Sequence, residues 1–237
     1  MKVLLLHAGI ADSRMWAPQV EVLRAAGHEP TAPDLPGFGE EPLVPPAVDY
    51  VAFAAGLLDG PAAVVGCSFG GRVALELAGA RPELVTHLVL VAPGFASTAW
   101  SEETQAGFAE EEELLERGDL AAAAEQQARM WLAPDAAQNV RELTAAMTVR
   151  SYEQQLPVEG EVRTVWPEPS AETRIAELAV PTLLVVGDRD RPELVALAKR
   201  LVRELPDARL ETIEGAGHLP GLERPDELDR LLLDFLQ

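Results

Sequence analysis

The chain has 237 residues, of which 48% are hydrophobic, so it is long enough to bury a full core in one large domain. Its net charge of −20 repels polyanions, which argues against nucleic acid and anionic membranes as partners. Cys67 is the only cysteine, which excludes an intrachain disulfide and a thiolate metal cluster.

The N-terminus, "MKVLLLHAG", has an apolar stretch that is too short for a signal peptide. No apolar run along the chain approaches the roughly 20 residues that span a bilayer. We therefore interpret the protein as soluble and cytoplasmic, with no membrane partner. The sequence leaves its oligomeric state open.

Short, continuous apolar runs recur at residues 2–7, 62–66, 87–92 and 181–187. Runs of this kind are typical of strands that are buried on both faces of a parallel sheet. Helical patterns alternate with them at 18–27, 71–79 and 192–206, and the C-terminus reads as an amphipathic helix. The pattern predicts an α/β fold with a doubly wound, mostly parallel sheet.

This alternation stops between about Ser97 and Leu178, where the sequence is helical and acidic and shows no clear buried strand. The strand pattern resumes at 181–187. The simplest account is a helical cap at 97–178 that is inserted into a core made of 1–96 and 179–237. We interpret the glutamate run at 110–113 as a solvated helix face.

The sequence "VVGCSFGG" places Ser68 between an apolar strand and a helical pattern. A nucleophilic serine needs such a tight turn, because the turn exposes its hydroxyl and requires small neighbours such as Gly66 and Gly70. The helix that follows directs its first N–H groups toward Ser68, and Phe69 N–H is the natural first oxyanion donor. Cys67, next to the turn, is expected to point into the core.

A serine nucleophile needs a base and a group that orients the base. His218 lies in a glycine-rich loop after a strand-like stretch, whereas His28 and His87 lie at the edges of ordinary elements. Asp188 and Asp190 both follow the strand at 181–187, at the strand end where catalytic groups of parallel sheets gather. The residues alone allow either aspartate as the acid, and Asp188 could instead cap the turn.

Five segments in this order resemble the α/β-hydrolase fold, in the branch of esterases and lactonases that includes 3-oxoadipate enol-lactonases. They are "LLLHAGIADSRMWAPQ", "APDLPGFG", "VVGCSFGG", "VVGDRD" and "GAGHLPGLERPDEL". They span nearly the whole chain. The order Ser, Asp, His is that of this family.

The resemblance implies a catalytic triad of Ser68, His218 and Asp190, with Asp190 preferred over Asp188 by the family's spacing. It places the second oxyanion donor on Gly9 N–H, with Ile10 as the alternative, because Ala8 stands where the family usually has glycine. His7 is expected to brace this loop by hydrogen bonding. The antiparallel hairpin that generally opens the family's sheet has no counterpart before the first strand.

The expected reaction is hydrolysis of a carboxylic ester, lactone or thioester of a small molecule through an acyl-enzyme, without a metal or an organic cofactor. A serine at the elbow is incompatible with the aspartate chemistry of haloalkane dehalogenases and epoxide hydrolases. Cleavage of a carbon–carbon bond, a lyase reaction, and a non-catalytic binding role remain open. The candidate pocket residues are Ile10, Phe38, Phe95, Trp100 and Trp131.

Overall fold

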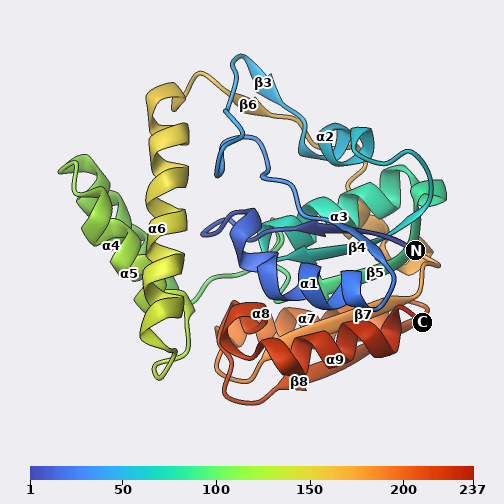
Figure 1. Cartoon of the computed structure of the whole chain (residues 1–237). Coiled ribbons are helices and arrows are strands. Elements are labelled where there is room, and N and C mark those ends of the chain that lie inside the picture. Colours follow the sequence, from blue (N-terminus) through green and yellow to red (C-terminus); the bar gives the residue numbers. More distant parts are fainter.

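A six-stranded sheet forms the centre of the computed structural model, which describes all 237 residues (Figure 1). Its strand order is β2-β1-β4-β5-β7-β8, and all of its strand pairings are parallel. The sheet therefore contains no antiparallel hairpin, as the sequence predicts. The strands are β1 (Lys2–Leu6), β2 (Glu29–Thr31), β4 (Ala62–Cys67), β5 (Val85–Val91), β7 (Thr182–Gly187) and β8 (Ala208–Ile213).

Helices cover both faces of this sheet, and alternate residues of each strand supply the two apolar layers. Val3 and Leu5 pack in the cluster that includes α1 (Ala17–Ala25) and α9 (Pro225–Phe235). Leu4 and Leu6 face the opposite cluster, with α2 (Tyr50–Gly56), α3 (Phe69–Ala80) and α7 (Pro192–Glu204). Burial of both faces explains why the strands read as continuous apolar runs. The doubly wound parallel sheet is confirmed.

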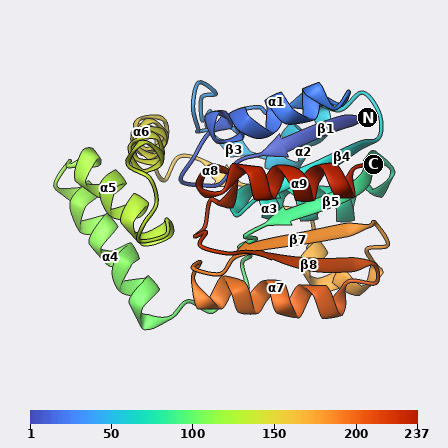
Figure 2. The same ribbon diagram turned by 60° about the horizontal axis from the view of Figure 1, so that its bottom comes forward.

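Three helices lie beyond the carboxyl ends of the strands, on the left of Figures 1 and 2. They are α4 (Glu102–Glu116), α5 (Leu120–Trp131) and α6 (Gln138–Gln155). Ser101 and Asp119 cap the first two helices, because their side chains accept hydrogen bonds from Thr104 N–H and Ala122 N–H. These helices occupy most of the predicted cap.

The segment that returns from α6 to the sheet packs against the main core. In this segment β6 (Arg163–Thr164) pairs with β3 (Ala47–Val48), and the 3-10 segment η4 (Ala171–Glu177) buries Ala171 and Ile175 in the core cluster beside α3. Residues 171–178 therefore pack with the core, although the predicted boundary assigns them to the cap. The remaining short elements are η1 (Ser13–Trp16), η2 (Pro82–Leu84), η3 (Leu156–Val158) and α8 (Pro220–Glu223).

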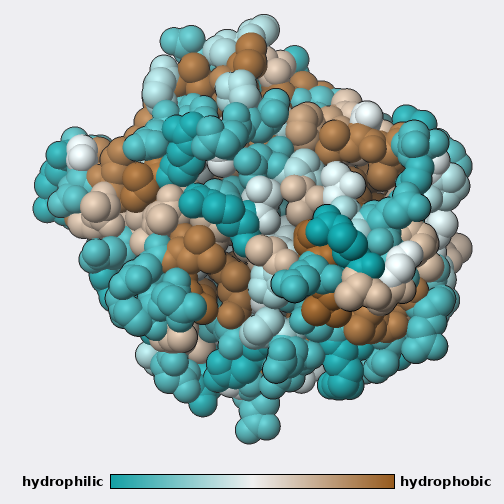
Figure 3. All heavy atoms as spheres, in the orientation of Figure 1, coloured by the Kyte–Doolittle hydropathy of each residue, from teal (hydrophilic) through white to brown (hydrophobic).

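The predicted strands and helices agree with the structure to within two residues at most ends. The apolar runs did not include β2, because it has three residues, contains Pro30 and lies at the edge of the sheet. The helical patterns did not include α2. In the view of Figure 3 the surface mixes hydrophilic and hydrophobic patches. None of the helices combines the length and the apolar character that crossing a bilayer requires.

Candidate active site

Ser68 lies at the turn between β4 and α3, in a backbone conformation that residues other than glycine rarely adopt. Its φ is 50° and its ψ is −112°. Two glycines make this turn possible. A Cβ atom on Gly66 would lie 2.2 Å from the Gly70 carbonyl oxygen, and one on Gly70 would lie 2.3 Å from the Leu6 carbonyl oxygen. The close approach of backbone to backbone therefore requires glycine at both positions.

Hydrogen bonds to neighbouring strands hold the turn in place. Ser68 N–H donates to the Val91 carbonyl at the end of β5 (2.9 Å), and Gly70 N–H donates to the His7 carbonyl after β1 (3.0 Å). The Ser68 hydroxyl makes no hydrogen bond within the chain. Its position at the N-terminus of α3 places it near the positive end of the helix dipole.

The side chains of His218 and Asp190 are in direct contact. His218 Nδ1 lies 3.1 Å from Asp190 Oδ1 and 3.0 Å from Asp190 Oδ2, and both side chains are almost fully buried. Asp188 does not take part, because its Oδ1 accepts a hydrogen bond from Gly215 N–H (2.7 Å). Of the two candidate aspartates, Asp190 is the one that the structure brings to the histidine.

The loop that carries His218 is attached to α5, one of the three helices beyond the carboxyl ends of the strands. His218 N–H donates to the Trp131 carbonyl (2.9 Å), and the Trp131 ring lies over the imidazole with the two centroids 4.5 Å apart. Trp131 Nε1 in turn donates to Gln127 Oε1 (2.7 Å). These contacts fix both the backbone and the ring plane of His218.

Glu223 is a second attachment between the histidine loop and the segment after α5, and no sequence pattern indicated it. Its buried carboxylate accepts hydrogen bonds from Gly217 N–H, Leu219 N–H and Ala133 N–H, at 2.8 to 3.1 Å. Burial raises the pKa of Glu223, and the three donated hydrogen bonds oppose that effect. One carboxylate thus joins residues on both sides of His218 to the start of the α5–α6 connection.

The loop after β1 brings Gly9 next to Phe69. A Cβ atom on Gly9 would lie 3.6 Å from Phe69 Cβ. His7 braces this loop, as predicted: Nδ1 donates to the Ala8 carbonyl (2.9 Å), while Nε2 accepts from Leu35 N–H (2.9 Å). Burial lowers the pKa of His7, which favours the neutral ring that these two bonds require.

One pocket of about 340 Å³ contains most of the predicted site residues. Ser68, His218, Gly9 and Phe69 line it, together with the predicted wall residues Ile10, Phe95, Trp100 and Trp131. Phe38 is not part of this wall, because its ring packs in the core against the rings of His7 and Phe69. The pocket has further lining residues that no sequence pattern indicated, namely Arg72, Gly94, Ala96, Phe108, Glu111 and Gln127.

The other histidines and the cysteine lie outside this pocket. Cys67 is buried, with its Sγ 3.7 Å from the His218 carbonyl, and burial raises the pKa of its thiol well above the ordinary value. His28 lies beside the N-terminal amine, and His87 packs against Phe235. In this structure no group of three or more His, Cys, Asp or Glu side chains is arranged to hold a metal ion.

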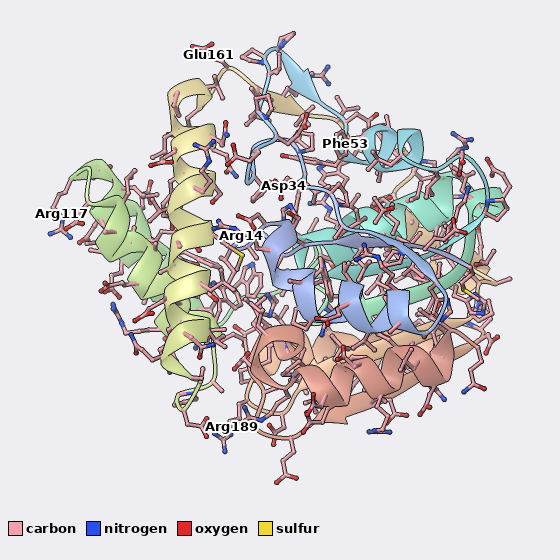
Figure 4. The ribbon with its side chains drawn as sticks, viewed as in Figure 1. Arg14, Asp34, Phe53, Arg117, Glu161 and Arg189 are labelled. Atoms are coloured by element: carbon pink, nitrogen blue, oxygen red, sulfur yellow. The ribbon has the colours of Figure 1, made fainter.

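A separate pocket lies between α6 and the core, where Figure 4 shows Arg14 and Asp34. Arg150 lines it and pairs with Glu40 and Glu153 (both 3.3 Å). This pocket shares no lining residue with the pocket at Ser68. Arg150 is therefore not placed to meet a molecule bound at Ser68.

Comparison with known proteins gives consistent matches over the whole chain. The model of the alpha/beta hydrolase family matches residues 3–231. A pimeloyl-(acyl-carrier protein) methyl ester esterase of Neisseria meningitidis is 31% identical over 249 residues, which cover 100% of this chain and 93% of that protein.

Solved structures agree in fold. An esterase from Exiguobacterium antarcticum aligns over 100% of this chain and 91% of its own, with a TM-score of 0.80 and 16% identity. The enol-lactonase from Burkholderia xenovorans covers 99% and 90%, with a TM-score of 0.78 and 21% identity.

Proposed function

Because the chain belongs to the alpha/beta hydrolase family, we propose that it is a serine hydrolase that cleaves an ester-like bond of a small molecule. Ser68 is the nucleophile, His218 the general base and Asp190 the group that orients the base. The observation that carries this proposal is the buried Asp190–His218 contact beside a pocket that Ser68 also lines. The esterase names of the curated relatives support the ester-cleaving chemistry.

The chemistry follows from the positions of these groups. His218 removes the Ser68 proton as the serine oxygen attacks the ester carbonyl, and it then protonates the departing alcohol. Water, activated by the same histidine, releases the acid and restores the serine. Asp190 holds the imidazole in the tautomer with a proton on Nδ1 and stabilises the imidazolium. The Ser68 hydroxyl and the imidazole must approach within about 3 Å for this transfer.

Phe69 N–H and Gly9 N–H are proposed as the donors that stabilise the oxyanion. Phe69 is the first residue of α3, where N–H groups lack partners within the helix, and Gly9 lies beside it. Each preorganised donor of this kind lowers the activation barrier by roughly 3 kcal/mol. The brace that His7 provides keeps the Gly9 loop in position relative to α3.

The helical segment within 97–178 is proposed as a cap that selects the substrate. Trp100, Phe108, Glu111, Gln127 and Trp131 come from this segment and form the side of the pocket opposite the strand ends. Apolar and aromatic walls of this type favour a small organic acyl or alcohol group.

The test is hydrolysis of p-nitrophenyl butyrate by the wild type and by Ser68→Ala, with folding checked by circular dichroism. We expect the folded variant to lose at least about three orders of magnitude in kcat. Ser13→Ala is the matched control, since this serine lines a different pocket, and it should keep its activity. Equal activity of wild type and Ser68→Ala, or an inactive wild type across acetate, butyrate and octanoate esters, contradicts the proposal.

A further inference from the structure

Arg72 lines the pocket at Ser68 and lies one helical turn away from it on α3. Its backbone N–H donates to the Ser68 carbonyl (3.1 Å). Both residues contribute to the wall of this one pocket of about 340 Å³. The guanidinium is therefore within reach of a molecule whose carbonyl is attached to Ser68.

Arg72 differs from the other half-buried arginines in having no partner for its charge. Each of the others makes hydrogen bonds or ion pairs, whereas the Arg72 side chain makes neither. The two nearby carboxylates are engaged elsewhere. Glu76 accepts hydrogen bonds from Ser170 and from Ala171 N–H, and Glu172 pairs with Arg200. The N–H groups of Arg72 are thus free within a strongly acidic protein.

The guanidinium is nevertheless held in a defined position. Its central carbon lies 3.8 Å from the centroid of the Trp166 ring. Trp166 is fixed in turn by Phe69 and Tyr50, with ring centroids 6.1 Å away in each case. Stacking occupies the face of the guanidinium and leaves the donors at its edge available, which is the arrangement that binds a planar anion with two hydrogen bonds.

Glu111 is the other charged residue of the pocket, and it comes from α4 on the cap side. Its carboxyl accepts a hydrogen bond from the Tyr152 hydroxyl (2.5 Å). Burial raises the pKa of Glu111 and so favours its uncharged form, although the Tyr152 bond opposes this. Glu111 is thus engaged by Tyr152, and neither it nor any other carboxylate forms an ion pair with Arg72.

From this arrangement, and resting on the proposed hydrolysis at Ser68, we infer that Arg72 binds a carboxylate at the far end of the acyl chain. The substrate class is a monoester of a short dicarboxylic acid. In this class the scissile carbonyl meets Ser68 and the free carboxylate meets the guanidinium edge. Hydrolysis then yields the alcohol and the dicarboxylate.

The experiment compares monoethyl adipate with the ethyl ester of adipic acid monoamide, which has the same shape and no charge. Ethanol release gives kcat/KM for each ester. We expect the wild type to prefer the carboxylate ester by about ten- to a hundredfold, as a charge-assisted bidentate contact implies. Arg72→Met should abolish that preference, mainly through KM, and Arg72→Lys should retain part of it.

Arg24→Met is the matched control, because Arg24 is exposed on α1, makes no ion pair, and changes the net charge equally. It should keep the preference for the carboxylate ester. A wild type that hydrolyses p-nitrophenyl butyrate but shows no such preference overturns the inference and leaves the proposed function standing.

Calorimetric binding of the two adipate esters to Ser68→Ala protein needs no turnover and separates the two proposals further. We expect the carboxylate ester to bind at least about tenfold more tightly than the amide, and this difference to vanish when Arg72→Met is added. Equal affinities in Ser68→Ala overturn the inference whether or not the wild type proves to be a hydrolase.

Discussion

The turn at Ser68 and the loop at His218 lie on the same pocket, but different parts of the molecule hold them. Ser68 is positioned by the sheet itself, through Val91 of β5 and the close approach of Gly70 to the backbone of β1. His218 is positioned from the insertion, through the Trp131 carbonyl and ring. One half of the site is thus built into the core, and the other half depends on how the helices dock.

The loop that carries Asp190 is held, like His218, by contacts with α5 and the connection that follows it. Its neighbour Arg189, labelled in Figure 4, pairs with Asp135 in the α5–α6 connection (2.5 Å), and Arg191 donates to the Met130 carbonyl (2.9 Å). A change in the insertion can therefore disturb the Asp190–His218 pair without moving Ser68. Substitutions that act on one side alone test this difference.

Gly70→Ala should have the largest effect, since it disrupts the contact between the turn at Ser68 and the backbone of β1. The added Cβ atom would lie 2.3 Å from the Leu6 carbonyl oxygen and 2.6 Å from the His7 carbonyl oxygen, so backbone must move. We expect about 3 kcal/mol lower free energy of unfolding and loss of activity, measured by urea denaturation and ester hydrolysis.

Gly56→Ala provides the control for that substitution. Gly56 ends α2, and a Cβ atom there meets nothing within 4 Å, so the change should be neutral or slightly stabilising. If both variants have the stability of the wild type, the turn at Ser68 is not fixed by backbone contact.

Glu223→Gln perturbs the other part of the site, the loop that carries His218. The amide keeps one acceptor oxygen and turns a donor toward N–H groups that Glu223 now satisfies. We expect kcat for an ester substrate to fall about tenfold, with about 2 kcal/mol lost from the free energy of unfolding. KM should change less, because Glu223 lies outside the pocket wall.

Glu76→Gln separates loss of stability from loss of alignment. Glu76 is also a buried carboxylate that accepts hydrogen bonds from a loop, at Ser170 and Ala171, but that loop does not carry His218. It should destabilise the protein by a similar amount and leave kcat nearly unchanged. Equal falls in kcat for both variants would show that Glu223 acts through stability alone.

The same division explains how much could be predicted from the sequence. The sheet and the turn at Ser68 depend on neighbours a few residues away or on adjacent strands, and local patterns indicate them. The brace at His7 also reaches Leu35, 28 positions away, and it was expected from the family resemblance. Phe38 was placed in the pocket wall wrongly, because a pattern shows that a residue is apolar and does not show which side of a loop it faces. In the structure its ring lies behind Phe69.

No local sequence pattern indicates the contacts between segments that are distant along the chain. Glu223 reaches Ala133, which is 90 positions away, and Trp131 covers His218 only because α5 docks at the strand ends. Arg72 could have been noticed from its position four residues after Ser68. Its missing ion pair, however, is visible only when every neighbouring carboxylate has been placed.

His7→Gln should have the smallest effect on stability. It tests how the free energy of unfolding depends on pH in the part of the site that the sheet holds. Because burial lowers the pKa of His7 below its ordinary 6.5, the unfolded chain binds a proton more readily than the folded protein. The contribution of His7 to the free energy of unfolding is full above pH 6.5 and declines as the pH falls toward the lowered pKa. The slope from this one group is at most about 1.4 kcal/mol per pH unit.

Thermal unfolding between pH 7.5 and 5.5 should therefore show a steeper loss of stability in the wild type than in His7→Gln. The reason is structural, since a second proton on the ring would set Nε2–H against Leu35 N–H, which now donates to that atom. Parallel profiles for the two proteins would mean that the hydrogen bond from Leu35 N–H breaks easily and does not hold down the pKa of His7. The loop at His7 would then be less rigid than the turn at Ser68. The part of the site that the sheet holds would differ less in rigidity from the loop that carries His218.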